Sequence, residues 1–226
     1  MILANTRGRL SAADLQLVVL LISQGSAARR HNVERRLASE GPDQLLDHPE
    51  LFERLLAVRT VLVPSEVLFF YVLVRHVLLR ARCDDREVAD YLAALLLEFG
   101  KRDRAWRIDW NDDQRHRYMV DILVDLESTD GERQFKVLAH LGNYALWLAG
   151  LFPDYIAARQ LRGGPALVYY ESLGIRGFGQ ASDHALADHY GLDGVFRTAS
   201  EQFPVLRHAL NQVSDRVLFP HIVERH

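Results

Sequence analysis

The longest apolar run in the chain predicts a buried helix at its centre. Eight apolar residues follow one another from Val67 to Val74, within a segment that we place at 64–82. A helix that is apolar on every side has no face for solvent, so other elements must surround it. The segment also holds Arg75 and His76, whereas a membrane span needs about 20 mostly apolar residues. We therefore interpret it as the buried centre of a soluble helical domain.

The two polar residues Arg75 and His76, within the segment 64–82, allow two interpretations. Charged side chains are rarely buried without a partner. We therefore expect Arg75 to share an exposed strip of the helix with Arg82, with the stems of both packed on apolar neighbours. The alternative is that Arg75 is a buried charge and that His76 is a base lining a pocket.

Apolar residues recur at helical spacing along most of the remaining chain, between capping residues and glycines. The predicted helix starts are Ser11 with Asp14, Asp84 with Glu87, and Asn111 with Gln114. Glycines punctuate the segment 175–180, which we predict to be a connector. Gly142 lies in an otherwise apolar helix and predicts a close approach by a neighbouring backbone.

These signals together predict an all-α fold, a multi-helix globular bundle of about nine to eleven helices. The predicted helices are 11–24, 27–40, a short one that opens at Pro49, 64–82, 84–99, 111–126, 132–152, 153–162, 165–174, 181–190 and 196–217.

One segment departs from the helical period. Trp106, Ile108 and Trp110 alternate with Arg107 and Asp109, which is the period of an extended strand. We therefore predict a short extended segment at 105–110. We expect residues 1–226 to form a single domain, and any subdomain boundary to fall near 100–111.

The C-terminal segment carries the most regular apolar pattern in the chain, a seam with steps of three and four residues. Pro204 interrupts it, so that either the helix kinks there or a new helix begins with Pro204 in its first turn. A seam of this kind can pack into its own domain or against a second copy, and we expect a homodimer. Its members are Phe196, Ala199, Phe203, Leu206, Leu210, Val213 and Val217.

Composition narrows the possible partners and the compartment. The formal net charge of −3 gives no overall attraction to nucleic acid or to an anionic membrane. The chain has a single cysteine, Cys83, so an internal disulfide framework and a cysteine-based zinc cluster are both excluded. We therefore expect a cytoplasmic protein with no membrane association.

A polar stripe on the predicted helix 132–152 is the first candidate ligand site. Lys136, His140, Asn143 and Trp147 share one helical side. Together with Tyr144, and with His76 from the central helix, they could line a pocket in which His140 titrates near neutral pH. The alternative, which the usual exposure of polar residues favours, is that the stripe is a solvated face.

A second candidate site combines cations with indole rings. Lys101, Arg102, Arg104, Trp106 and Arg107 have the composition that tracks a phosphate backbone and stacks bases. Residues 29–36 are also rich in arginine. The net charge of 101–110 is only +2, so we favour indoles that seal the core beneath a solvated edge, and we do not expect nucleic acid as the partner.

No sequence motif assembles a catalytic or metal centre. His184 with Asp188, and Asp113 with His116, are two-residue pairs, whereas a metal needs three or more converging ligands. We expect no metal and no cofactor.

The leading hypothesis is a non-catalytic cytoplasmic protein that acts by macromolecular binding, as a homodimer. The alternative is a small-molecule-binding protein or enzyme with a pocket around His140. A weaker alternative is nucleic-acid binding through the arginine-rich segments.

Overall fold

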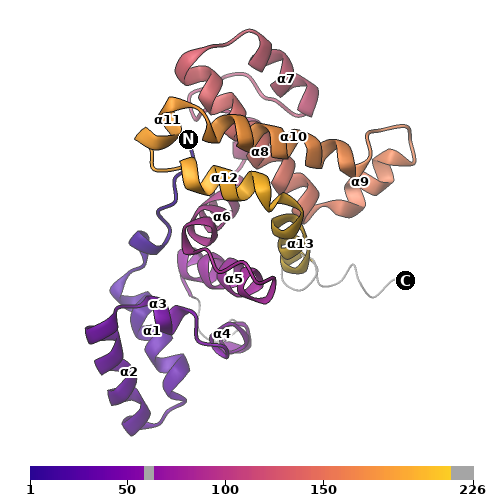
Figure 1. Ribbon diagram of the computed structural model, residues 1–226. Helices are drawn as coiled ribbons and strands as arrows, with labels where there is room; N and C mark the ends of the chain where they lie inside the picture. The colour runs from indigo at the N-terminus through magenta and orange to yellow at the C-terminus, as the bar shows by residue number, and fades with distance from the viewer. Residues whose placement is uncertain (59–63, 215–226) are drawn as a thin grey trace.

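The computed structural model describes residues 1–58 and 64–214, and this part of the chain is all-α, as predicted (Figure 1). It holds 13 α-helices, of which 11 have seven or more residues, and no strand. Two 3₁₀ turns, η1 (Arg7–Arg9) and η2 (Arg104–Trp106), complete the elements. The helices are α1 (Ala12–Ser23), α2 (Ala27–Glu40), α3 (Asp43–Leu46), α4 (Leu51–Val58), α5 (Glu66–Arg80), α6 (Arg86–Phe99), α7 (Met119–Glu127), α8 (Gly131–Leu151), α9 (Pro153–Gln160), α10 (Leu167–Ser182), α11 (Ala185–His189), α12 (Asp193–Glu201) and α13 (Phe203–Val213).

The local capping signals place some helix starts correctly and misplace others. Ser11 and Asp14 form the predicted capping box of α1. Asp85 caps α6 in place of the predicted Asp84, because the Asp84 carboxylate accepts a hydrogen bond from Arg75. The predicted start of α7 at Asn111 is also wrong.

The segment 105–110 does not form the extended strand that its alternation predicted. Trp106 ends the 3₁₀ turn η2, and its backbone N–H donates to the Asp103 carbonyl over 3.2 Å. The backbone N–H of His116 donates to the Trp106 carbonyl over 2.7 Å. This bond ties 111–117 to η2, so α7 begins only at Met119.

The predicted central helix, α5, is buried as expected. All residues from Tyr71 to Leu78 are buried. The helix packs against α6, α13, α4 and η1, and Ser65 caps its start by accepting a hydrogen bond from the Leu68 backbone N–H over 3.1 Å. No helix of the described residues is long and apolar enough to cross a membrane.

A second centre of helix packing, besides α5, is the contact between α8 and α10, and glycines allow these two helices to approach closely. A Cβ added to Gly177 would lie 2.7 Å from the backbone nitrogen of Gly142, so the two backbones touch, as predicted for Gly142. The predicted connector 175–180 is wrong, because these residues lie within α10. Glycine lowers helix propensity, but the packing of a bare helix face can outweigh that cost.

The C-terminal seam is divided between two helices. Pro204 lies in the first turn of α13, as the second of the two alternatives predicted. The six described seam residues are all buried, at 0 or 1% exposure, and α13 packs against both α5 and α8. The described seam residues therefore pack between α5 and α8 of the same chain and offer no surface to a second copy. Val217 lies outside the described residues.

The buried apolar side chains form one contiguous cluster that includes residues of all the longer helices. The α1–α2 pair projects from one end of the molecule, and α9 lies toward the opposite end (Figure 1). A single domain, with any subdomain boundary near 100–111, stays a prediction.

Candidate functional site

The predicted polar stripe on α8 is buried for half of its length. His140 and Asn143 are 3% and 4% exposed, so the solvated-face interpretation is wrong for them. Asn143 accepts a hydrogen bond from the Tyr91 hydroxyl over 2.9 Å. Lys136 is partly exposed and pairs with Asp109 over 2.7 Å.

The space beside His140 is too small for an organic ligand. A cavity of about 10 Å³ adjoins His140 and Asn143, which is room for about one water-sized particle. Burial, followed by the charge of nearby Arg104, lowers the pKa of His140 well below its usual value. The ring is therefore neutral at pH 7.

The other two α8 residues of the predicted site, Tyr144 and Trp147, lie on a different and larger depression. Their rings stack with centroids 5.8 Å apart, and the His140 ring stacks on Tyr144 at 6.0 Å. The stripe therefore divides between an inner polar end and an outer aromatic end.

This outer depression, which we call the aromatic groove, is built from η2, the start of α7, the second half of α8, α9 and the start of α10. It consists of two adjoining hollows with volumes of about 160 and 290 Å³. Eight aromatic side chains line it, together with two arginines. The aromatic residues are Trp106, Tyr118, Tyr144, Trp147, Phe152, Tyr155, Tyr169 and Tyr170, and the remaining lining residues are Arg117, Met119, Val120, Leu148, Arg159 and Pro165.

Hydrogen bonds and ring stacking fix the positions of the side chains that line the groove. The Tyr144 hydroxyl donates to the Arg117 carbonyl over 2.9 Å, which fixes the chain just before α7. Burial raises the pKa of Tyr144 to about 12, so the hydroxyl keeps its proton at neutral pH. Arg117 lies over the Trp106 ring at 4.9 Å, and Arg159 lies over the Tyr118 ring at 5.4 Å.

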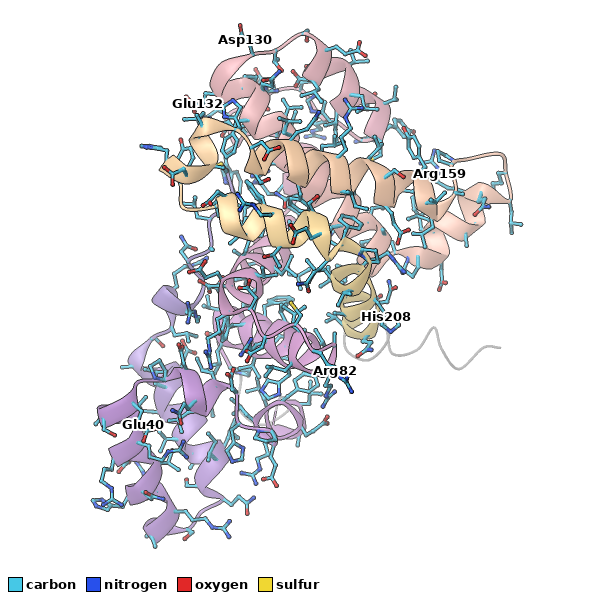
Figure 2. All side chains as sticks on the ribbon, in the orientation of Figure 1. Glu40, Arg82, Asp130, Glu132, Arg159 and His208 are labelled. Atoms are coloured by element: carbon cyan, nitrogen blue, oxygen red, sulfur yellow. The ribbon has the colours of Figure 1, made fainter. Side chains whose placement is uncertain are left out.

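The charge of the groove is positive. No carboxylate lines either hollow, and neither Arg117 nor Arg159 forms an ion pair with a carboxylate of the described residues. Figure 2 shows Arg159 on α9, at the end of the molecule away from α1 and α2. Both guanidinium groups are therefore available to a negatively charged ligand.

Exposed apolar side chains extend this surface beyond the groove. Val120 and Val124 on α7 are mostly exposed, as are Leu161 after α9 and Val168 on α10. Val120 lines the groove itself, Val124 follows it by one helical turn, and Val168 directly precedes the lining residue Tyr169. Exposed apolar side chains beside an apolar groove are typical of an interaction site.

His76 belongs to another part of the molecule. Its Nε2–H donates to the Leu46 carbonyl over 3.0 Å, and its ring stacks on Phe52 with centroids 6.0 Å apart. Burial lowers its pKa. His76 therefore does not join His140 in one pocket.

Arg75, next to His76, contradicts the predicted exposed strip. It is 0% exposed and pairs with Asp47 and Asp84, whereas Arg82 is exposed. It is the buried charge of the alternative interpretation.

The basic segment 101–107 does not present its cations together. Lys101 and Arg102 are exposed, Arg107 is partly buried, and Arg104 is only 2% exposed, so Arg104 cannot reach a phosphate backbone. Trp106 lines the aromatic groove beneath Arg117. Trp106 packs partly buried against the core, as expected, whereas Trp110 is 49% exposed, so the prediction that both indoles seal the core is wrong for Trp110.

The described residues contain no group of three or more potential metal-ligating side chains. His184 accepts a hydrogen bond from the Leu186 backbone N–H as the cap of α11. His116 is buried, with its Nε2 3.2 Å from Asp125. Burial also raises the pKa of the Cys83 thiol, which argues against a nucleophile.

Sequence reasoning found Tyr144, Trp147 and Trp106 but missed Arg117, Arg159 and most of the other groove residues. The groove draws on five separate segments, so no single periodic pattern contains it. The one available signal was the density of aromatic residues between 106 and 170. Comparisons of this chain with protein-family models, with curated proteins and with solved structures gave no match.

Proposed function

We propose that this is a non-catalytic binding protein and that the aromatic groove receives a segment of another protein. The bound segment would carry an aspartate or glutamate beside an aromatic or large aliphatic side chain. The observation that carries this proposal is a groove lined by eight aromatic side chains and two arginines, with no carboxylate.

The chemistry of the groove selects such a segment. Aromatic rings provide large apolar contact area, and arginine hydrogen-bonds a carboxylate in bidentate fashion. Tyrosine, tryptophan and arginine are also the residues that most often carry the binding energy of protein interfaces.

The surroundings of the groove favour a macromolecule over a small molecule. The exposed side chains Val124 and Val168 do not line the two hollows and add apolar surface outside them, where a small ligand would not reach. We also propose a cytoplasmic location, supported by the single cysteine. A homodimer stays a prediction and would need a surface other than the seam.

The second candidate function is the binding of a small aromatic carboxylate. The larger hollow, of about 290 Å³, is at the lower end of the range for small-ligand sites. The groove is open, however, and a small ligand there would keep much of its surface in water.

A displayed library of random peptides tests the proposal. We expect enriched peptides to place an acidic residue beside tryptophan, phenylalanine or leucine. Arg117→Gln and Arg159→Gln should each weaken their binding about tenfold, because each removes a hydrogen bond between charged groups. Arg162→Gln is the matched control, since Arg162 is exposed in the neighbouring loop and does not line the groove.

The same experiment separates the two candidates. Titration with 2-naphthoate, followed by the fluorescence of Trp106 and Trp147, measures small-ligand binding. Binding of 2-naphthoate without peptide enrichment would overturn the protein-partner proposal in favour of the second candidate. Enriched peptides that bind equally well to Arg117→Gln and Arg159→Gln would remove the groove as the site.

A further inference from the structure

A second polar site adjoins η2, where Arg104 is buried without an ion pair to any described carboxylate. The Arg104 side chain is 2% exposed. Its Nη1 donates to the Arg107 carbonyl, and its Nε has no hydrogen-bond partner. Within the described residues Arg104 forms no ion pair.

The two carboxylates whose charges act most strongly on Arg104 form ion pairs with other cations. Glu98 pairs with Lys101, and Asp109 pairs with Lys136. Burial lowers the pKa of Arg104, and the more distant charges of Glu98 and Asp109 raise it by less, so the pKa stays below its usual value. The Arg104 guanidinium also lies over the Phe99 and Trp110 rings, 6.0 and 5.5 Å from their centroids, and such cation–π contacts are mildly favourable. Neither ring supplies a full negative charge, and a buried ion without one costs several kcal/mol, so an anion from outside the chain would lower that cost.

His140 supplies a second unpartnered nitrogen at the same place. Its ring is 3% exposed, and its Nε2 has no hydrogen-bond partner. The cationic groups that act on His140 include Arg104, Arg133 and the N-terminal amino group, all of which lower its pKa. The local field is therefore positive, and the neutral ring can donate one N–H.

Arg104 and His140 line the same cavity, which has a volume of about 10 Å³. Met1, Lys136 and Asn143 also line it, and among the described residues no carboxylate does. A space of this size holds about one small particle, which excludes phosphate, sulfate and any organic anion.

We infer that this cavity binds one monatomic anion, chloride under cellular conditions, held by the Arg104 guanidinium and the ring N–H of His140. A water molecule would satisfy the same hydrogen bonds, but it would leave the buried charge of Arg104 uncompensated. The bound anion would fix η2 against α8. Because Trp106 belongs to η2 and lines the aromatic groove, the anion would also stabilise one wall of that groove.

Thermal unfolding in sodium chloride and in sodium gluconate at equal ionic strength tests the inference. The unfolding midpoint of the wild type should rise by a few degrees with chloride and reach a plateau, since a ligand that binds only the native state stabilises it. Arg104→Met should abolish this rise. Arg102→Gln removes an exposed neighbouring cation and should leave the rise unchanged.

Bromide provides a direct test of the position. A crystal grown in sodium bromide should show an anomalous peak beside Arg104 and His140. If Arg104→Met fails to fold, His140→Phe replaces it, because this variant removes only the ring N–H and should weaken the chloride response.

Three outcomes would overturn the inference. One is the absence of both a chloride-specific rise and a bromide peak, which would leave water in the cavity. Another is a bromide peak without any chloride-dependent rise, which would indicate an adventitious ion only. The third is a chloride response that Arg104→Met retains in full.

Discussion

Two arginines are buried in this one core, and carboxylates surround one of them but not the other. Arg75 on α5 and Arg104 on η2 are 0% and 2% exposed. Each guanidinium leaves one buried nitrogen without a hydrogen-bond partner. Arg75, however, donates three hydrogen bonds to carboxylates, whereas Arg104 donates one to a neutral backbone carbonyl. The main difference therefore lies in the charge of their acceptors.

The chain itself neutralises Arg75. Its Nε and Nη2 donate to the two oxygens of Asp47 over 2.7 and 2.9 Å, and Asp84 accepts a further bond. Burial would lower the pKa of Arg75, but these hydrogen bonds outweigh burial and raise it. Arg104 has no such carboxylate, and burial lowers its pKa.

The comparison separates a structural cation from a cation suited to bind a ligand. Arg75 joins α5 to Asp47, which follows α3, and to Asp84, which precedes α6, so it holds three parts of the chain together. Arg104 pairs with no carboxylate in residues 1–58 and 64–214. We therefore expect substitutions at the two sites to change stability by different amounts.

The largest effect is expected for Arg75→Met. This change leaves the partly buried Asp47 carboxylate without its bidentate partner, and it should lower the free energy of unfolding by about 3 kcal/mol. Urea unfolding measures the change. Arg82→Met is the control, because Arg82 is exposed and its loss should change stability by no more than about 0.5 kcal/mol. Equal effects of the two substitutions would contradict the structural role of Arg75.

A smaller effect, which depends on pH, is expected for Asp47→Asn. Burial would raise the pKa of Asp47, but hydrogen bonds from Arg75 and Arg86 outweigh it and hold the pKa below its usual value. The carboxylate therefore stabilises the fold fully above about pH 4, and that contribution is lost as the pH falls through the lower pKa of the folded state. Asp47→Asn should cost about 2 kcal/mol at neutral pH.

Unfolding in urea at a series of pH values checks this prediction. The wild type and Asp47→Asn should differ most at neutral pH and converge in acid. Asp84→Asn is the matched comparison, because the Asp84 side chain is 72% exposed and exposed ion pairs contribute little. A constant difference between the wild type and Asp47→Asn down to low pH would show that the lost stability does not come from the charge.

Arg75 and its helix show which parts of this structure the sequence could predict. The burial of α5 follows from its own run of apolar residues, and the cap of α1 follows from Ser11 and Asp14, three positions apart. The ion pair of Arg75 joins residues 28 positions apart. No local pattern contains that information. Arg75 was therefore predicted to be exposed because its distant carboxylate partner could not be seen in the sequence.

The same limit applies to the candidate groove and to α10. Tyr144 and Trp147 were predicted because they share a helix with His140, whereas Arg117 and Arg159 come from two other segments and were missed. In α10, glycines that would weaken an isolated helix allow α8 to approach, and that benefit exists only in the folded chain.

The smallest effect is expected for Arg104→Met, measured in gluconate without chloride. Without an anion in the cavity, the substitution removes an unpaired buried charge and keeps an apolar side chain of similar length. Such replacements are often neutral or stabilising, whereas the lost bond to the Arg107 carbonyl costs about 1 kcal/mol. The free energy of unfolding should therefore stay within about 1 kcal/mol of the wild-type value. A loss as large as that of Arg75→Met would mean that Arg104 is neutralised within the chain, and the distinction between the two arginines would fail.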